Sequence, residues 1–191
     1  MNKTLAAVAL ALALGPFPAR AAEQDITRHP AYVDGSAILE LAGEDGDIVE
    51  VSIGPGLMGA MRAGVDDATG LLSGLRGIYA YVVNLDHDAA REAGARRKVK
   101  SLEQQLSATG WERIVRVREE GDHVNVFTRP GGDGRPGSAQ IVSGLVVLVL
   151  EGDESQVVFV NIIGDMDMAK LGALADTVNL PGLRDLSGDD E

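Results

Sequence analysis

Four aspartates stand at two places where a predicted strand ends and a predicted helix begins. Asp86 and Asp88 follow one strand, with His87 between them, and Asp165 and Asp167 follow another. If these strands lay side by side in the same direction, the carboxylates would meet at one edge of a sheet. Oxygen-rich clusters bind Ca²⁺, Mg²⁺ or Mn²⁺, and paired carboxylates carry out acid–base hydrolysis. A metal- or carboxylate-dependent hydrolase centred on this cluster is therefore one hypothesis.

Helix capping is the interpretation that we favour for the same aspartates. An Asp at a helix start accepts hydrogen bonds from backbone N–H groups that lack partners in the first turn. Gly164 lets the chain leave the strand at an unusual backbone angle, and Asp165 follows at once. Apolar residues then recur every three positions, at Met168, Leu171 and Leu174. We expect Asp165 or Asp167 to cap a final helix over about Asp167 to Val178.

A glycine pattern resembles the turn of a dinucleotide-binding fold. The stretch IVEVSIGPGLMGAMRAG contains Gly54, Gly56 and Gly59 in G-x-G-x-x-G spacing between a predicted strand and a predicted helix. The acidic residue that would contact the ribose is expected about 20 positions further on, whereas Asp86 lies 32 positions after Gly54. We therefore predict that no nucleotide cofactor binds and that these glycines serve the turn and close packing.

Other catalytic or metal-binding sets are not evident in the sequence. The three histidines are scattered without zinc-site spacing, and the absence of cysteine excludes disulfides, thiolate ligands and a lipidated N-terminal cysteine. No serine lies in a G-x-S-x-G motif, and we expect Ser143-Gly144 to mark a bulge or close packing in a strand. We predict no metal and no cofactor.

The N-terminus has the pattern of a secretory signal peptide. Lys3 precedes an apolar run from Leu5 to Leu14, and Ala19-Arg20-Ala21 follows, which predicts cleavage after Ala21 or Ala22. No later apolar stretch reaches membrane-spanning length. We expect a periplasmic or extracellular protein that is not a lipoprotein, and the formal net charge of −12 makes nucleic acid a poor partner.

The first half of the chain predicts strands and helices in alternation. Strands are expected at Ala37 to Leu41 and Asp47 to Ile53, joined by a turn, and Pro55 suits the first turn of a helix. The run from Ile78 to Leu85 is typical of a buried strand. Asp86 or Asp88 then caps a long helix, whose apolar stripe is Ala95, Val99, Leu102 and Leu106.

After Gly110, which should end that helix, the apolar period changes to two. Trp111 should pack back on the helix, and Glu112 to Arg118 and His123 to Thr128 predict a hairpin. The next predicted strands are Ile141 to Leu150, which is apolar on both faces and should be central, and Gln156 to Ile163.

This order predicts an α+β fold with a mostly antiparallel sheet. Its C-terminal part is a four-strand meander, and helices should pack on one face. The predicted division of the chain is a signal peptide at 1–21, a lead-in with a possible first strand at 22–47, one α+β domain at 48–178 and an acidic tail at 179–191.

The second half resembles a known family. Three parts carry the likeness: Trp111 to Asp122, an aromatic residue followed by a strand with basic residues and a charged turn; the hairpin from Leu145 to Ile163; and Gly164-Asp165-Met166-Asp167-Met168, a Gly-Asp-apolar-Asp-apolar start to a helix. The chain is similar over about residues 48 to 178 to the bacterial family DUF4252, a domain of unknown function. Gly164, Asp165 and Asp167 best match its signature.

The resemblance implies an α+β domain in the cell envelope and identifies no catalytic residue. Members of the family look like small exported proteins, and some are lipoproteins, from which this chain departs because it has no cysteine. We therefore expect a non-enzymatic envelope protein that binds a protein partner, with the Asp-based hydrolase as the alternative.

Overall fold

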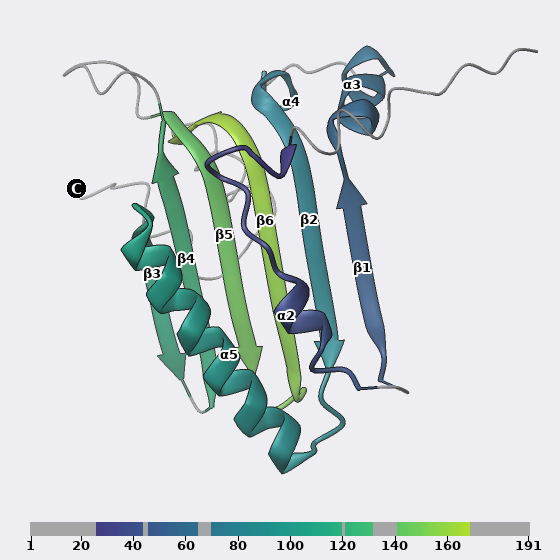
Figure 1. Cartoon of the computed structure of the whole chain (residues 1–191), viewed down its shortest axis with the longest axis vertical. Helices are drawn as coiled ribbons and strands as arrows, with labels where there is room; N and C mark the ends of the chain where they lie inside the picture. The colour runs from purple at the N-terminus through teal and green to yellow at the C-terminus, as the bar shows by residue number, and fades with distance from the viewer. Residues whose placement is uncertain (1–25, 44–45, 65–69, 120, 132–140, 169–191) are drawn as a thin grey trace, which may run out of the picture.

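The computed structural model describes residues 26–43, 46–64, 70–119, 121–131 and 141–168, and Figure 1 shows their arrangement. The helices are α2 (Ser36–Leu39), α3 (Pro55–Gly64), α4 (Leu71–Gly74) and α5 (Ala89–Ala108). The strands are β1 (Ile48–Ile53), β2 (Leu75–Asn84), β3 (Glu112–Glu119), β4 (Asp122–Pro130), β5 (Ile141–Glu151) and β6 (Gln156–Asp167).

The six strands form one antiparallel sheet in the order β1-β2-β6-β5-β4-β3. Strands β3 to β6 are neighbours in chain order, so the predicted four-strand meander and the α+β class are confirmed. The hairpin β1–β2 completes the sheet because β2 pairs with β6. As expected, β5 is an inner strand.

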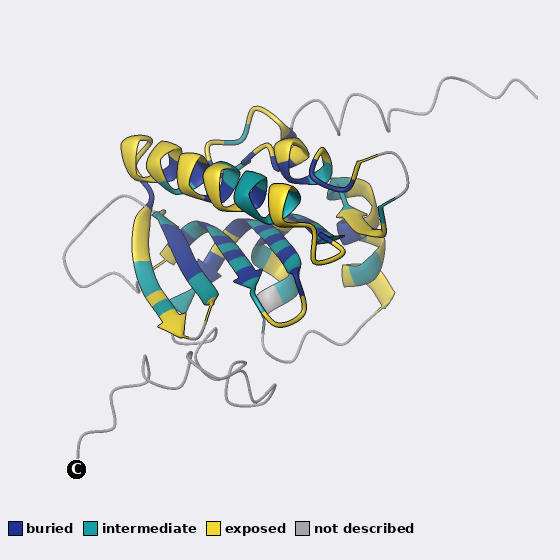
Figure 2. Cartoon of the chain, turned by 90° about the horizontal axis from the view of Figure 1, so that it is seen from below, coloured by how far each residue is buried: buried dark blue, intermediate teal, exposed yellow. Residues whose placement is uncertain are grey.

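Helices α5 and α2 lie on one face of the sheet, which we call the covered face (Figure 1). The predicted stripe of α5 is buried against it: Ala95, Val99, Leu102 and Leu106. Gly110 has a φ of 84°, and the Trp111 N–H donates to the Leu106 carbonyl at 3.2 Å, so the predicted helix end is confirmed. Figure 2 shows the exposed side of α5 turned away from the sheet.

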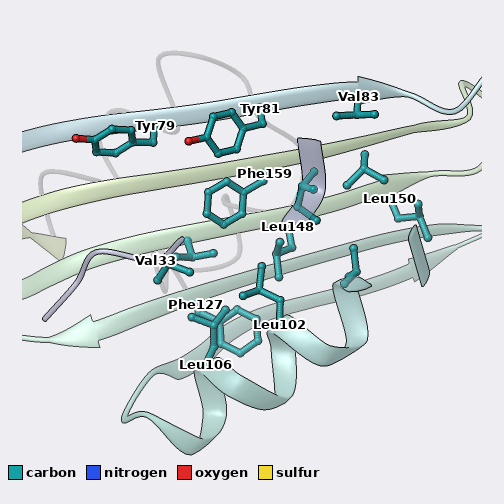
Figure 3. Close-up of a cluster of buried hydrophobic side chains, with 14 of the residues drawn as sticks. Val33, Tyr79, Tyr81, Val83, Leu102, Leu106, Phe127, Leu148, Leu150 and Phe159 are labelled. Atoms are coloured by element: carbon teal, nitrogen blue, oxygen red, sulfur yellow. The ribbon is translucent and has the colours of Figure 1, made fainter. Parts of the chain in front are cut away.

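The main core fills the space between α5, α2 and the covered face (Figure 3). Phe127, Leu148 and Phe159 are fully buried there, and the Tyr81 ring stacks on Phe159 with centroids 5.6 Å apart. A second cluster forms at one end of the opposite face. Its buried members are Met58, Leu75, Val142 and Met166.

The lead-in before α2 crosses the covered face. The buried Asn161 side chain accepts from the Val33 N–H at 2.9 Å and donates to the Ala31 carbonyl at 3.0 Å. Gly144 allows this close crossing, because a Cβ there would lie 2.4 Å from the Cβ of Ala31. The ladder shifts register between Val142 and Gly144, so the predicted bulge is confirmed.

Two element predictions are wrong. The predicted strand at Ala37 to Leu41 is instead the short helix α2 and the turn after it, which bury Ile38 and Leu41 in the main core. The last strand does not end at Ile163 but continues to Asp167, because Ile141 and Val142 of β5 extend the ladder beyond the bulge. The predicted signal peptide, acidic tail and final helix beyond Met168 lie outside the described residues.

Candidate functional site

The structure does not bring the four predicted carboxylates together. Strands β2 and β6 are neighbours, but they run in opposite directions, with Leu75 opposite Gly164 and Asn84 opposite Gln156. The Asp86–Asp88 and Asp165–Asp167 segments therefore lie at opposite ends of the sheet, about 30 Å apart at 3.3 Å per residue. Among the described residues, no group of three or more His, Asp or Glu side chains could hold a metal ion.

Asp88 caps α5, as one of the two aspartates was expected to do. Its carboxylate accepts from the N–H groups of Ala90 and Arg91, both at 2.8 Å. These hydrogen bonds, first from Arg91 and then from Ala90, lower the pKa of Asp88 below its usual value of 3.8. Asp86 instead pairs with the Arg91 guanidinium at 2.6 Å in an exposed position. Both aspartates therefore have structural contacts at the start of α5.

The family-signature residues lie where β6 passes the end of α4. Gly164 has a φ of 137°, and a Cβ there would lie 2.3 Å from the carbonyl oxygen of Gly74. A Cβ on Gly74 would lie 1.9 Å from the carbonyl oxygen of Asp165. These two glycines therefore permit a close backbone crossing, which gives the signature glycine a structural role. Asp165 lies within β6, so the prediction that a helix starts at this residue is wrong, and a cap by Asp167 depends on residues beyond those described.

The glycine pattern after β1 does not belong to a dinucleotide-binding unit. Such a unit needs two parallel strands joined by a crossover helix. Here β1 and β2 are antiparallel partners, with Ile53 opposite Ile78. A Cβ on Gly54, Gly56 or Gly59 would meet nothing within 4 Å, so the prediction that these glycines permit close packing is wrong.

The feature that the motif search missed is the face of the sheet opposite α5, which we call the open face. The ladder register places two apolar rows across all six strands of this face. The first row is Val51, Ala80, Val160, Val147, Val126 and Val115. The second row is Val49, Val82, Val158, Val149, Val124 and Val117. We call them the valine rows.

No described helix lies over the middle of the open face, which the valine rows cross (Figure 2). At 4.7–4.9 Å per strand they span about 24 Å across the sheet. Together with the adjoining row of Ile53, Ile78, Ile162 and Leu145 they extend about 13 Å along the strands. Val126 is buried and the other members on the inner strands are only partly exposed, so the part of the rows that is open to solvent lies at one edge. At the β1 edge the side chains are open to solvent, with Val49 59% and Val51 41% exposed.

One border of the valine rows is polar and acidic. Two residues beyond the second row, on the same face, the sheet carries Glu119 opposite Asp122 and Glu151 opposite Gln156. Asn84 lies opposite Gln156 and continues this row into β2. The open face thus combines a wide apolar surface with negative charge along one side.

The sequence does carry a signal for this face. The segments that form β5 and β6 are apolar on both sides, a pattern typical of strands that are covered on both faces. The described helices α5 and α2 cover the inner strands of the covered face, whereas β1 is exposed on both faces. Because the described helices cover β5 and β6 on one side only, the apolar residues on their other side predict that something else packs on the open face.

In the described part of the chain, no helix is both long and apolar enough to span a membrane. No curated protein and no solved structure matches this chain. A family model does match, over residues 42–174, with the description "Domain of unknown function (DUF4252)". This range includes all the strands of the sheet, the capped helix α5 and the signature at Gly164 and Asp165. The chain therefore belongs to the DUF4252 family.

Proposed function

We propose that this is an exported binding protein of the cell envelope, which uses the valine rows to hold an amphipathic segment of a partner protein. The observation that carries the proposal is the pair of apolar rows that run across all six strands and open to solvent at the β1 edge. Water-exposed valines at Val49 and Val51 contribute nothing to the core of this chain. Burying them in a complex would be favourable, at about 25 cal/mol per Å² of apolar surface.

The acidic border specifies the charge of the partner. A segment that places apolar side chains on the valine rows would bring its flank close to Glu119, Asp122 and Glu151. Basic residues on that flank would be attracted, and acidic residues would be repelled. The partner segment should therefore combine an apolar stripe with lysine or arginine along one side.

Export rests on the N-terminal pattern and on the family resemblance. The positive start, the apolar run from Leu5 to Leu14 and the small residues up to Ala21 follow the order of a secretory signal. An envelope protein without cysteine must rely on its core for stability, and the two apolar clusters of this chain provide one. This setting offers protein partners with amphipathic segments.

The binding proposal is tested with a fluorescently labelled amphipathic peptide of leucine and lysine and a matched peptide of leucine and glutamate. Anisotropy titration should show saturable binding of the basic peptide, weakened by salt because exposed charges are screened. The double variant Val49→Gln/Val51→Gln should weaken this binding by about tenfold, since about 1.4 kcal/mol of apolar burial is lost.

Ile48→Gln is the matched control, because Ile48 is also exposed, at 46%, but lies on the other face of the same strand. Its affinity should equal that of the unchanged protein. The proposal is wrong if neither peptide binds, if the acidic peptide binds equally well, or if both variants lose the same affinity.

A further inference from the structure

A cleft lies at the end of the sheet where β2 begins. Three parts of the chain form its walls: the lead-in before α2 at residues 26–30, the helices α3 and α4, and the first residues of β2. Figure 1 shows the start of the described chain, in purple, beside α4 and at the same end of the sheet as α3. The cleft has a volume of about 540 Å³. Pockets of this size hold small organic molecules.

The three walls each bring one arginine to the cleft. Arg28 comes from the lead-in, Arg62 from α3 and Arg76 from β2. Asp165 is the acidic residue among the described residues that line the cleft. With His29 neutral, three positive charges and one negative charge give the lining a formal charge of +2. Because the whole chain carries −12, the cleft is a local concentration of the opposite charge.

Two of these arginines have no acidic partner. In the described part of the chain, neither Arg28 nor Arg76 forms an ion pair, and both side chains are exposed. Their guanidinium groups are therefore available to an anion from solution.

Arg62 is instead held in position by the backbone. Its Nε donates to the carbonyl oxygen of Met58 at 3.3 Å, and its Nη1 donates to the carbonyl oxygen of Ser73 at 3.2 Å. These hydrogen bonds join α3 to α4 and use only part of the five N–H donors of a guanidinium. Part of the cationic lining is thus ordered before a ligand arrives, which lowers the entropic cost of binding.

Apolar side chains complete the lining. Ile26 and Leu75 are buried, with exposed fractions of 3% and 9%, and Pro30 and Pro55 add rigid apolar surface. A ligand with a small apolar body next to its anionic group would make favourable contacts with both parts of this lining.

The charge of the lining favours a phosphate over a carboxylate. A guanidinium presents parallel N–H groups that match the oxygens of either anion. A phosphate monoester carries about −1.5 to −2 near neutral pH and balances the charge of +2, whereas a carboxylate carries a single negative charge.

We propose that this cleft binds a small organic phosphate monoester, with the phosphate on the three arginines and the apolar part against Ile26 and Leu75. The site goes beyond the proposed function. It lies at the Leu75 end of β2, whereas the acidic border of the valine rows lies at the Asn84 end.

The proposal is tested by NMR titration of the ¹⁵N-labelled protein with phenyl phosphate. The amide signals of Arg28, Ser73 and Arg76 should shift and saturate, and added salt should weaken binding because exposed charges are screened. Phenyltrimethylammonium, which has the same ring and the opposite charge, should cause no such shift. Benzoate should bind about tenfold more weakly, because its single charge makes fewer charge-assisted hydrogen bonds.

Substitutions identify the residues that hold the phosphate. Arg28→Gln and Arg76→Gln should each weaken phenyl phosphate binding by about tenfold, since each removes charged hydrogen-bond donors. Arg116→Gln is the matched control, because Arg116 is also exposed but lies on β3, at the far edge of the sheet. Its affinity should equal that of the unchanged protein.

The double variant Val49→Gln/Val51→Gln separates this site from the valine rows, and it should bind phenyl phosphate as tightly as the unchanged protein. A loss of affinity in this variant would show that the probe contacts the valine rows, and the assignment to the cleft would be wrong. The proposal is also overturned if phenyl phosphate does not saturate, if benzoate binds equally well, or if Arg116→Gln loses as much affinity as Arg28→Gln.

Discussion

Asp88 stabilises the start of α5 through charged hydrogen bonds, and this makes its contribution dependent on pH. The backbone N–H groups of Arg91 and Ala90 lower the pKa of its carboxyl group in the folded protein. A carboxyl group whose pKa is lower in the folded state than in the unfolded state stabilises the folded protein at any pH above its unfolded-state pKa. This stabilisation is lost as the pH falls through the folded-state pKa. The relevant window therefore lies below about pH 4.

We expect Asp88→Ala to lower the melting temperature by a few degrees at neutral pH. Asp88→Asn should lower it less, because the amide oxygen still accepts both hydrogen bonds and only the charge is lost. Thermal melts by circular dichroism between pH 3 and 7 measure both effects. The difference between Asp88→Ala and the unchanged protein should shrink toward pH 3, and a difference that grows on acidification would contradict the capping role.

Gly164 and Gly59 should respond in opposite ways to the same substitution. At Gly164 an alanine would be strained by the positive φ and would collide with the Gly74 carbonyl oxygen, so we expect a loss of about 2–5 kcal/mol in the free energy of unfolding.

Gly59, inside α3, has open space around its Cα, so Gly59→Ala should raise the free energy of unfolding by about 0.5–1 kcal/mol. Urea unfolding of the two variants measures both values. Similar losses in both would show that the crossing of α4 and β6 is not what requires Gly164.

At the scale of elements, the lead-in depends on one buried side chain. Asn161→Ala would leave the Val33 N–H and the Ala31 carbonyl without their partner, at a cost of about 1–3 kcal/mol for each group that stays buried. We therefore expect amide exchange at Val33 to accelerate and the protein to unfold at lower urea concentration. Asn125→Ala, which removes a single hydrogen bond to Glu103, is the comparison and should cost less. Unchanged exchange at Val33 would contradict this role of Asn161.

At the scale of the whole molecule, export predicts a defined mature chain. Because Ala19-Arg20-Ala21 follows the apolar run, we expect the protein recovered from the periplasm to begin at Ala22 or Glu23. Intact-mass measurement distinguishes these starts from a chain that retains residues 1–21. Replacing Leu10 by Arg should block processing and keep the protein in the cytoplasm, because a charge interrupts the apolar run. A full-length mass in the periplasmic fraction would refute the predicted signal peptide.

Local patterns determined much of this fold from the sequence. The capping Asp88, the stripe of α5, the helix end at Gly110 and the β3–β4 hairpin all follow from residues that are close in the chain. The short connections from β3 to β4 and from β5 to β6 also make these two pairs antiparallel neighbours, since a tight turn can join adjacent strands only in that arrangement. The α+β class and the covered face were predictable for these reasons.

Tertiary structure decided which distant strands pair. The antiparallel pairing of β2 with β6 separates the two aspartate segments, and no local pattern encodes it. Together with the other ladders, this pairing aligns valines from all six strands into continuous rows, although no strand by itself shows which residues its neighbour places beside it. The sequence by itself determined the elements and their apolar faces, whereas the open face exists only because long-range pairing sets strand order and register together.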